Sequence, residues 1–214
     1  MKNNRAYKKG KGFRDSSLII IACEGEKTEP KYFSLFERIH PRKCRIEVLP
    51  SHDDKSQHNS APKWLLERTK KYKEENQIGP GDFLFIVSDV DRWKLESIYN
   101  VDAFCKEFLN HFLIISNPCF EVWLFYHLGE SKKQNANDCG DWKRIVHKKT
   151  GIGFTIEKYA ANIFEAVRKA KEDDDTPNHF FPKEKKSKVY KIIEAIIDKV
   201  GEGNFKAFIE DLSK

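Results

Sequence analysis

The sequence lacks any hydrophobic run close to the roughly 20 residues that a membrane-spanning helix needs. It also lacks a signal peptide, because its basic N-terminal segment leads into only a short apolar run without a small-residue cleavage site. These absences predict a cytoplasmic protein with no membrane partner.

Closely spaced cysteines are also missing. The chain has 5 cysteines, an odd number, and they are widely separated along the sequence. Neither a disulfide framework nor a zinc-binding motif fits this spacing. We therefore expect reduced and mostly buried thiols.

Excess positive charge is confined to the N-terminal segment. The formal net charge is +6, and residues 1–14 hold six basic residues and no acid. The rest of the chain is therefore formally neutral. We expect residues 1–15 to form a basic flexible tail, in which Lys8, Lys9 and Lys11 contact phosphate groups without reading base sequence. A tail that only aids solubility is the alternative.

Short apolar runs alternate with helical patterns as far as residue 129. The runs predict strands at 18–23, 44–50, 83–88 and 112–116, and the patterns predict helices at 29–40, 62–76, 101–110 and 118–128. Such alternation is typical of a parallel sheet with helices on both faces. We expect an α/β fold: a doubly wound, mainly parallel four-stranded sheet over residues 16–129.

The remaining residues, 130–214, carry only helical patterns, of which those at 141–151, 155–172 and 184–200 are the clearest. Apolar side chains recur there at the spacing of one helix face. We expect a helical C-terminal extension, without strands, packed on the α/β domain.

Acidic residues follow the predicted strands. Glu24 follows the first strand, Asp89 and Asp91 follow the third, and Glu121 lies about one turn into the helix after the fourth. Ligands of open parallel sheets bind beyond the carboxyl ends of the strands. We therefore expect these acids to lie at one edge of the sheet.

Carboxylates directed at one point repel each other unless a cation lies between them. Asp89 and Asp91 point the same way if their segment is extended. Oxygen ligands favour Mg²⁺ or Mn²⁺ over zinc. We predict that Glu24, Asp89 and Asp91 bind such a metal, and that Glu121, beside apolar surface, is a catalytic candidate that needs a partner. Helix capping or surface solvation by these acids is the alternative.

Two other phosphate-handling motifs fit poorly. The segment "GEKT" lacks the glycine that precedes the lysine of a phosphate-binding loop, and its acids would repel phosphate. A haloacid-dehalogenase-like phosphatase carries its nucleophilic aspartate on the first strand, whereas this chain has D-x-D after the third.

Three segments, "IIIACEGEKTEPKYF", "FLFIVSDVDRW" and "ISNPCFEVWLFYH", resemble in this order the RloB-like family of bacteria. Glu24–Gly25 and the later D-x-D are also similar to the motifs of Toprim domains. The resemblance implies a Toprim-like fold, with Glu24 as the Toprim glutamate and Asp89 and Asp91 as metal ligands. Related nucleases commonly carry a second acid four residues after the glutamate. Thr28 stands there, so Glu26 or Glu29 would fill that role.

The resemblance also implies a function in anti-phage defence and abortive infection, often beside an ABC-type ATPase. We predict a Mg²⁺-dependent endonuclease that cleaves DNA or RNA, with Glu24 as general acid or base. Lys27 or Arg92 would stabilise charge on the phosphate. Trp93 and Trp123 would stack on bases or pack in the core. A non-catalytic effector or regulatory subunit of the ATPase is the alternative.

Overall fold

The computed structural model describes residues 16–39, 44–50, 62–90, 93–129, 135–151 and 155–212. Its centre is a five-stranded sheet with the order β2-β1-β3-β4-β5. The strands are β1 (Ser17–Cys23), β2 (Cys44–Leu49), β3 (Phe83–Asp89), β4 (His111–Asn117) and β5 (Lys186–Ser187). The first four pair in parallel, as predicted, whereas β5 is antiparallel to β4.

The central strands are buried on both sides of the sheet. Side chains of a strand point alternately to its two faces, and β1 contributes to two separate apolar clusters. Ile19, Ile21 and Cys23 belong to one cluster, and Leu18, Ile20 and Ala22 belong to the other. Central parallel strands therefore need the continuous apolar runs seen in the sequence.

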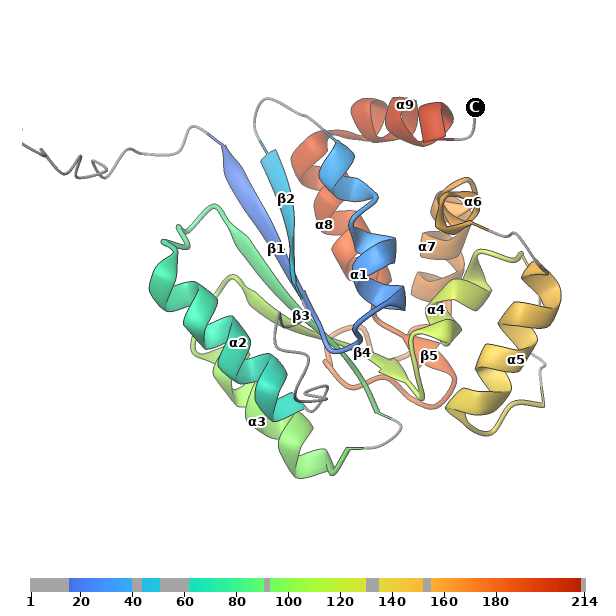
Figure 1. Cartoon of the computed structure of the whole chain (residues 1–214), viewed down its shortest axis with the longest axis horizontal. Helices are drawn as coiled ribbons and strands as arrows, with labels where there is room; N and C mark the ends of the chain where they lie inside the picture. Colours follow the sequence, from blue (N-terminus) through green and yellow to red (C-terminus); the bar gives the residue numbers. More distant parts are fainter. Residues whose placement is uncertain are drawn as a thin grey trace, which may run out of the picture.

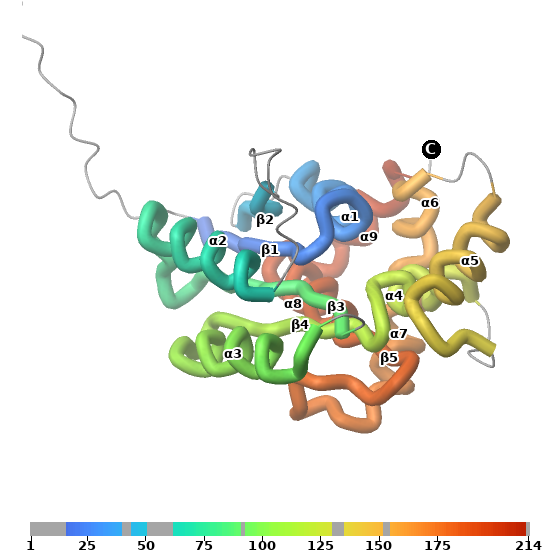
Figure 2. Tube along the Cα trace, turned by 60° about the horizontal axis from the view of Figure 1, so that its bottom comes forward, coloured from blue at the N-terminus to red at the C-terminus, as the bar shows by residue number. Residues whose placement is uncertain are grey.

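Helices cover both faces of the sheet (Figures 1 and 2). One face carries α2 (Pro62–Glu75) and α3 (Leu95–Lys106), and the other carries α1 (Thr28–Phe33), the 3-10 helix η1 (Phe36–Arg38), α8 (Tyr190–Val200) and α9 (Glu202–Leu212). The chain moves from β1 to β2 in one direction and through β3 to β4 in the other, so right-handed crossovers bring their helices to opposite faces. This is the predicted doubly wound arrangement.

Four further helices lie beyond the sheet: α4 (Glu121–Tyr126), α5 (Cys139–Thr150), α6 (Ile156–Ala160) and α7 (Ile163–Glu172). α4 follows β4 and packs against α5 and α7, whereas α6 contacts α9. The helix predicted over 155–172 is thus two helices. They are separated at Asn162, whose side-chain amide donates a hydrogen bond to the carbonyl of His127 at 2.9 Å.

The fifth strand corrects the prediction of four strands and of a strand-free C-terminal region. Lys186 and Ser187 of β5 pair with Asn117 and Ser116 at the end of β4. Two residues are too few to show a period of two, so the sequence carries no signal for this strand.

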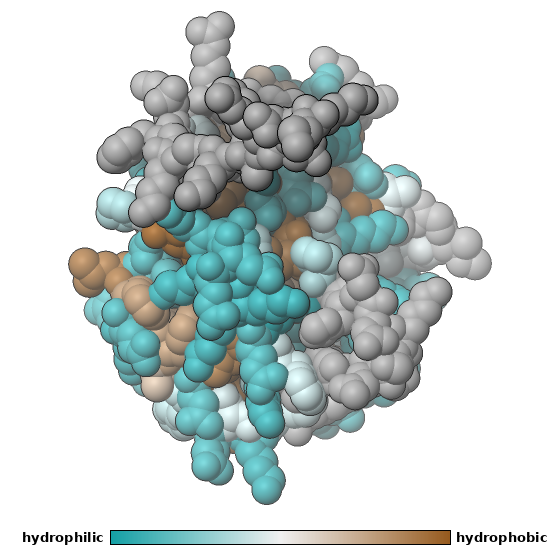
Figure 3. All heavy atoms as spheres, turned by 60° about the vertical axis from the view of Figure 1, so that its left-hand side comes forward, coloured by the Kyte–Doolittle hydropathy of each residue, from teal (hydrophilic) through white to brown (hydrophobic). Residues whose placement is uncertain are grey.

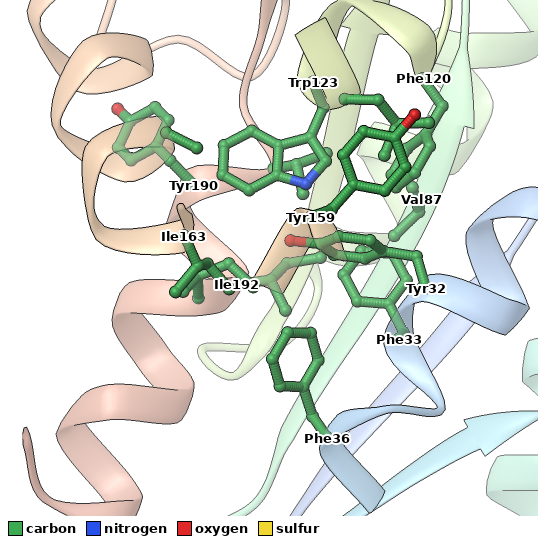
Figure 4. Close-up of a cluster of buried hydrophobic side chains, with 14 of the residues drawn as sticks. Tyr32, Phe33, Phe36, Val87, Phe120, Trp123, Tyr159, Ile163, Tyr190 and Ile192 are labelled. Atoms are coloured by element: carbon green, nitrogen blue, oxygen red, sulfur yellow. The ribbon is translucent and has the colours of Figure 1, made fainter. Parts of the chain in front are cut away.

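The larger apolar cluster joins the two halves of the chain. Figure 4 shows Tyr32, Phe33 and Phe36, on the segment after β1, next to side chains from the helices that follow β4. The rings of Phe36 and Phe205 stack with centroids 6.0 Å apart. Helices from the C-terminal half therefore form one wall of the core that encloses β1 and β3.

A buried ion pair stabilises the chain around β5. The Lys188 ammonium lies 2.5 and 2.6 Å from the carboxylate oxygens of Asp174, and the Tyr190 hydroxyl donates to the same carboxylate at 2.7 Å. Lys188 is 1% exposed. The pair is therefore desolvated, and each partner depends on the other.

The outer surface is mainly polar where α2 and α3 cover the sheet. Figure 3 shows this side of the molecule, on which hydrophilic side chains surround smaller hydrophobic areas. Within the ranges that the structure describes, no helix is both long and apolar enough to cross a membrane.

Candidate metal-binding site

The strand order reverses between β1 and β3. β1 leads to β2 on one side, and β3 leads to β4 on the other, while β1 and β3 pair directly. Ligands of such sheets bind at this reversal, beyond the carboxyl ends of the strands. Glu24 directly follows β1 and Asp89 ends β3. Two of the predicted metal ligands therefore lie at the expected point.

Three hydrogen-bond donors hold the carboxylate of Glu24. Its Oε2 accepts from the hydroxyl of Ser88 and from the backbone N–H of Asp89, the latter at 3.1 Å. Its Oε1 accepts from the indole N–H of Trp93. These bonds fix Glu24 against the end of β3, so Trp93 orients a candidate ligand.

Asp89 has a buried carboxylate oxygen, Oδ1, with no hydrogen-bond donor among the residues described. Burial raises the pKa of Asp89 well above its usual range, and the charges of Glu29, Glu24 and Glu121 raise it further. A hydrogen bond with the Phe120 backbone acts to lower this pKa, but its effect is smaller. A cation would satisfy the orphaned oxygen and remove the repulsion.

Glu29 of α1 is the second acid of the first segment. It is 9% exposed, whereas Glu26 is exposed to solvent. Burial raises the pKa of Glu29 from 4.5 to about 7, and the charges of Glu121 and Glu24 add to this rise. Its carboxyl group packs directly over Gly25, where a Cβ atom would overlap it. The fold therefore brings Glu29, and not Glu26, to the other acids.

Glu121 begins α4 and is also 9% exposed. Its Oε2 lies 3.9 Å from the thiol of Cys139, which donates to it. Burial acts to lower the pKa of Lys143 on α5, but Glu121, Cys139 and Cys119 together outweigh burial, so the pKa is raised. We call Glu24, Glu29, Asp89 and Glu121 the carboxylate cluster.

Other predicted residues lie elsewhere. Lys27 is exposed at the start of α1. Trp123 is fully buried in the core, which excludes base stacking by this residue and confirms the packing alternative. The remaining predicted site residues, Lys8, Lys9, Lys11, Asp91 and Arg92, lie outside the described ranges.

The sequence analysis did not predict two basic residues that lie near the carboxylate cluster. Arg68 of α2 donates from its guanidinium to the carbonyl of Cys23, at the end of β1. Lys143 interacts with Glu121, as noted above. Both lie on helices with many charged residues, so nothing in the sequence separates them from solvent-exposed neighbours.

A family model described as RloB-like protein matches residues 19–196. The chain belongs to the RloB-like family. The matched range of this RloB-like protein contains the whole carboxylate cluster and runs from β1 into α8, so it includes C-terminal helices as well as the sheet. No curated protein and no solved structure matches the chain.

The cluster offers oxygen donors in a partly desolvated setting. Mg²⁺ and Mn²⁺ prefer carboxylate oxygen, whereas zinc also accepts nitrogen and sulfur. Glu24 and Asp89, with the orphaned Oδ1 atom, therefore fit a hard divalent cation at this edge of the sheet.

Proposed function

We propose that this RloB-like protein is a Mg²⁺-dependent or Mn²⁺-dependent endonuclease with a Toprim-like site, and that it acts in anti-phage defence. The main support is the contact between Glu24 and the backbone of Asp89, at 3.1 Å, at the reversal point of the sheet. Acids from two separate strands thereby share one location, next to an orphaned carboxylate oxygen.

Glu24, Asp89 and Asp91 would hold the metal, Glu29 would supply a further oxygen ligand, and Glu121 is a catalytic candidate beside them. A metal bound there would polarise a phosphoryl oxygen and make a water molecule nucleophilic at neutral pH. Phosphodiester hydrolysis is the reaction that uses both effects.

The chain's own groups position these ligands and move protons. Ser88 and Trp93 keep the Glu24 carboxylate from rotating, and Glu24 acts as general acid or base. Glu29, with a pKa of about 7 before metal binds, is a further proton carrier, because such a group changes charge near neutral pH. Lys27 and Arg92 would stabilise charge on the phosphate.

The substrate is a nucleic acid, DNA or RNA. We propose that Lys8, Lys9 and Lys11 contact its backbone, since the rest of the chain has no net charge to attract phosphate. A cytoplasmic location and an ABC-type ATPase partner complete the proposal. The alternative is an effector subunit of that ATPase without catalysis.

A cleavage assay on plasmid DNA, single-stranded DNA and tRNA tests the proposal. We expect cleavage with Mg²⁺ or Mn²⁺ and none with EDTA. Asp89→Asn and Glu24→Gln should each reduce the rate by at least about 100-fold, the usual cost of removing a group that stabilises developing charge. Glu26→Gln, on the same segment but exposed, is the matched control and should cleave normally.

Circular dichroism of each variant checks that the fold is intact. Protection of cells against phage provides the second readout. If Asp89→Asn protects cells as well as the unmodified protein does, the nuclease proposal is wrong and the effector alternative is favoured.

A further inference from the structure

Two buried cysteines lie beside Glu121. Cys119 precedes α4 and Cys139 begins α5. The two sulfur atoms and a carboxylate oxygen of Glu121 all lie within 4.8 Å of one another. The three residues are 0%, 8% and 9% exposed, in the order Cys119, Cys139, Glu121. The fold has therefore brought Cys139 to Cys119 and Glu121, which are neighbours in sequence, and the three are potential metal ligands.

The separations suit one small ion. Zinc binds thiolate sulfur at about 2.3 Å and carboxylate oxygen at about 2.0–2.2 Å in tetrahedral geometry, which places neighbouring donor atoms about 3.5–4 Å apart. Sγ of Cys139 lies 3.9 Å from Oε2 of Glu121. Sγ of Cys119 lies within 4.8 Å of the Cys139 sulfur and of a carboxylate oxygen of Glu121. Only small side-chain rotations would bring the three donors to one centre.

The present contacts leave Glu121 poorly satisfied. Across the described part of the chain, the hydrogen bond found for its carboxylate comes from the Cys139 thiol, which is a weak donor. A buried carboxylate needs stronger partners. Lys143 interacts electrostatically with Glu121, Cys139 and Cys119. Two thiolates and one carboxylate would be neutralised by a divalent ion together with the Lys143 ammonium.

We propose that Cys119, Cys139 and Glu121 form a binding site for Zn²⁺ or a similar thiophilic divalent ion. Sulfur ligands select such ions against Mg²⁺, which prefers oxygen. The site is distinct from the one proposed at Glu24 and Asp89, and it does not depend on nuclease activity, although Glu121 belongs to both surroundings. Binding would join the start of α5 to the segment before α4.

Three protein ligands leave one tetrahedral position open. Closed structural zinc sites use four protein ligands, whereas three ligands plus an exchangeable position are typical of sites that bind water or a substrate group. The proposed ion would therefore exchange its fourth ligand, and its binding would release the two thiol protons to solvent.

Cobalt titration of the reduced, metal-free, full-length protein tests the proposal, because thiolate-bound Co²⁺ absorbs by charge transfer and oxygen-bound Co²⁺ does not. We expect one Co²⁺ per chain with thiolate absorption, displaced by Zn²⁺ and unaffected by excess Mg²⁺. Cys119→Ser and Cys139→Ser should each weaken Co²⁺ binding by about 100-fold or more, since loss of outer contacts alone costs about 10- to 100-fold. Cys105→Ser, a buried cysteine of α3 in the other apolar cluster, is the matched control and should bind normally.

A second measurement covers variants that fail to fold. Zn²⁺ should protect Cys119 and Cys139 of the unmodified protein from alkylation, while Cys105 reacts at the same rate with and without the ion, as read by mass spectrometry. Cobalt binding without thiolate absorption, or equal protection of all cysteines, would overturn the proposal. Asp89→Asn should retain the thiolate signal; its loss would show that the thiolate-bound ion also needs Asp89 and would overturn the proposal of a distinct site. Failure of the nuclease assay leaves these readouts unchanged.

Discussion

Gly25 stands where the chain leaves β1, and the carboxyl group of Glu29 packs over its Cα atom. A Cβ atom at position 25 would overlap that group, so Gly25→Ala should displace Glu29 from the cluster. The displaced group is the end of a flexible side chain. We therefore expect the free energy of unfolding to change by less than about 1 kcal/mol.

Binding of Mg²⁺ to Gly25→Ala, measured by calorimetry, should be weaker by about tenfold or more, as expected when a supporting carboxylate is lost. Gly81→Ala is the matched control, because no atom lies within 4 Å of a Cβ there. Unchanged Mg²⁺ affinity in Gly25→Ala would exclude Glu29 from the site.

The raised pKa of Glu29 makes the stability of the metal-free protein depend on pH. The pKa is 4.5 for an ordinary glutamate and about 7 in the fold, so folding takes up a proton between these values. The stabilising contribution is complete below pH 4.5 and is lost as the pH rises through 7. The melting temperature without metal should therefore fall across this range.

Glu29→Gln should flatten this pH dependence, and Mg²⁺ should raise the melting temperature more at alkaline than at acidic pH. Differential scanning calorimetry in EDTA and in Mg²⁺ measures both. The pKa of Asp89 is also raised in the fold, so Asp89 should change the stability with pH in the same direction. A melting temperature that rises from pH 5 to pH 8 in EDTA, and falls in Glu29→Gln, would contradict the assignment.

At the scale of single elements, the ends of the apolar strands were predicted more accurately than the ends of some helices. β1, β2, β3 and β4 each begin and end within one residue of the predicted runs, because central parallel strands need unbroken apolar sequence. In contrast, α3 begins at Leu95, six residues before the predicted start. In its first two turns Ile98 is buried, whereas Leu95 and Tyr99 are exposed, so the apolar residues there do not mark one buried face.

In the candidate site, too, some residues were predictable from the sequence and others were not. Glu24 and Asp89 were predictable, since acids at the ends of adjacent parallel strands must lie close together. The pairing of Cys119 with Cys139 was not, because it depends on how α4 and α5 pack against each other. Spacing along the sequence carries no record of that contact, and the same holds for Arg68.

The chain around β5 offers a direct comparison of a buried and an exposed ion pair. Lys188→Met leaves the buried Asp174 without its cation, and we expect a loss of about 3–5 kcal/mol. Lys186→Met removes a partner of the exposed Asp175 and should cost less than about 1 kcal/mol. Urea unfolding measures both changes. If Lys188→Met lowers the free energy of unfolding as little as Lys186→Met does, Asp174 must gain other hydrogen-bond partners or become solvated.

At the scale of the whole molecule, the sheet and the C-terminal helices share one core. Phe205 and Ile209 of α9 belong to the same apolar cluster as Ile19 and Ile21 of β1. A fragment that ends at residue 129 should therefore expose the sheet face that α8 covers, and we expect it to show no cooperative unfolding transition.

Thermal denaturation followed by circular dichroism compares this fragment with a chain that lacks residues 1–14, which should unfold like the full protein. A sharp transition in the fragment would show that residues 16–129 fold without the C-terminal helices. It would also make the C-terminal helices an accessory layer.

The stacking of Phe36 on Phe205 has a consequence for biosynthesis. A chain emerges from the ribosome N-terminus first. Glu24 and Asp89 are therefore exposed before α9, the helix that completes the larger apolar cluster. The nascent polypeptide can therefore complete the core beside the carboxylate cluster only after α9 has been synthesised. Partial chains released before that point should lack an ordered cluster.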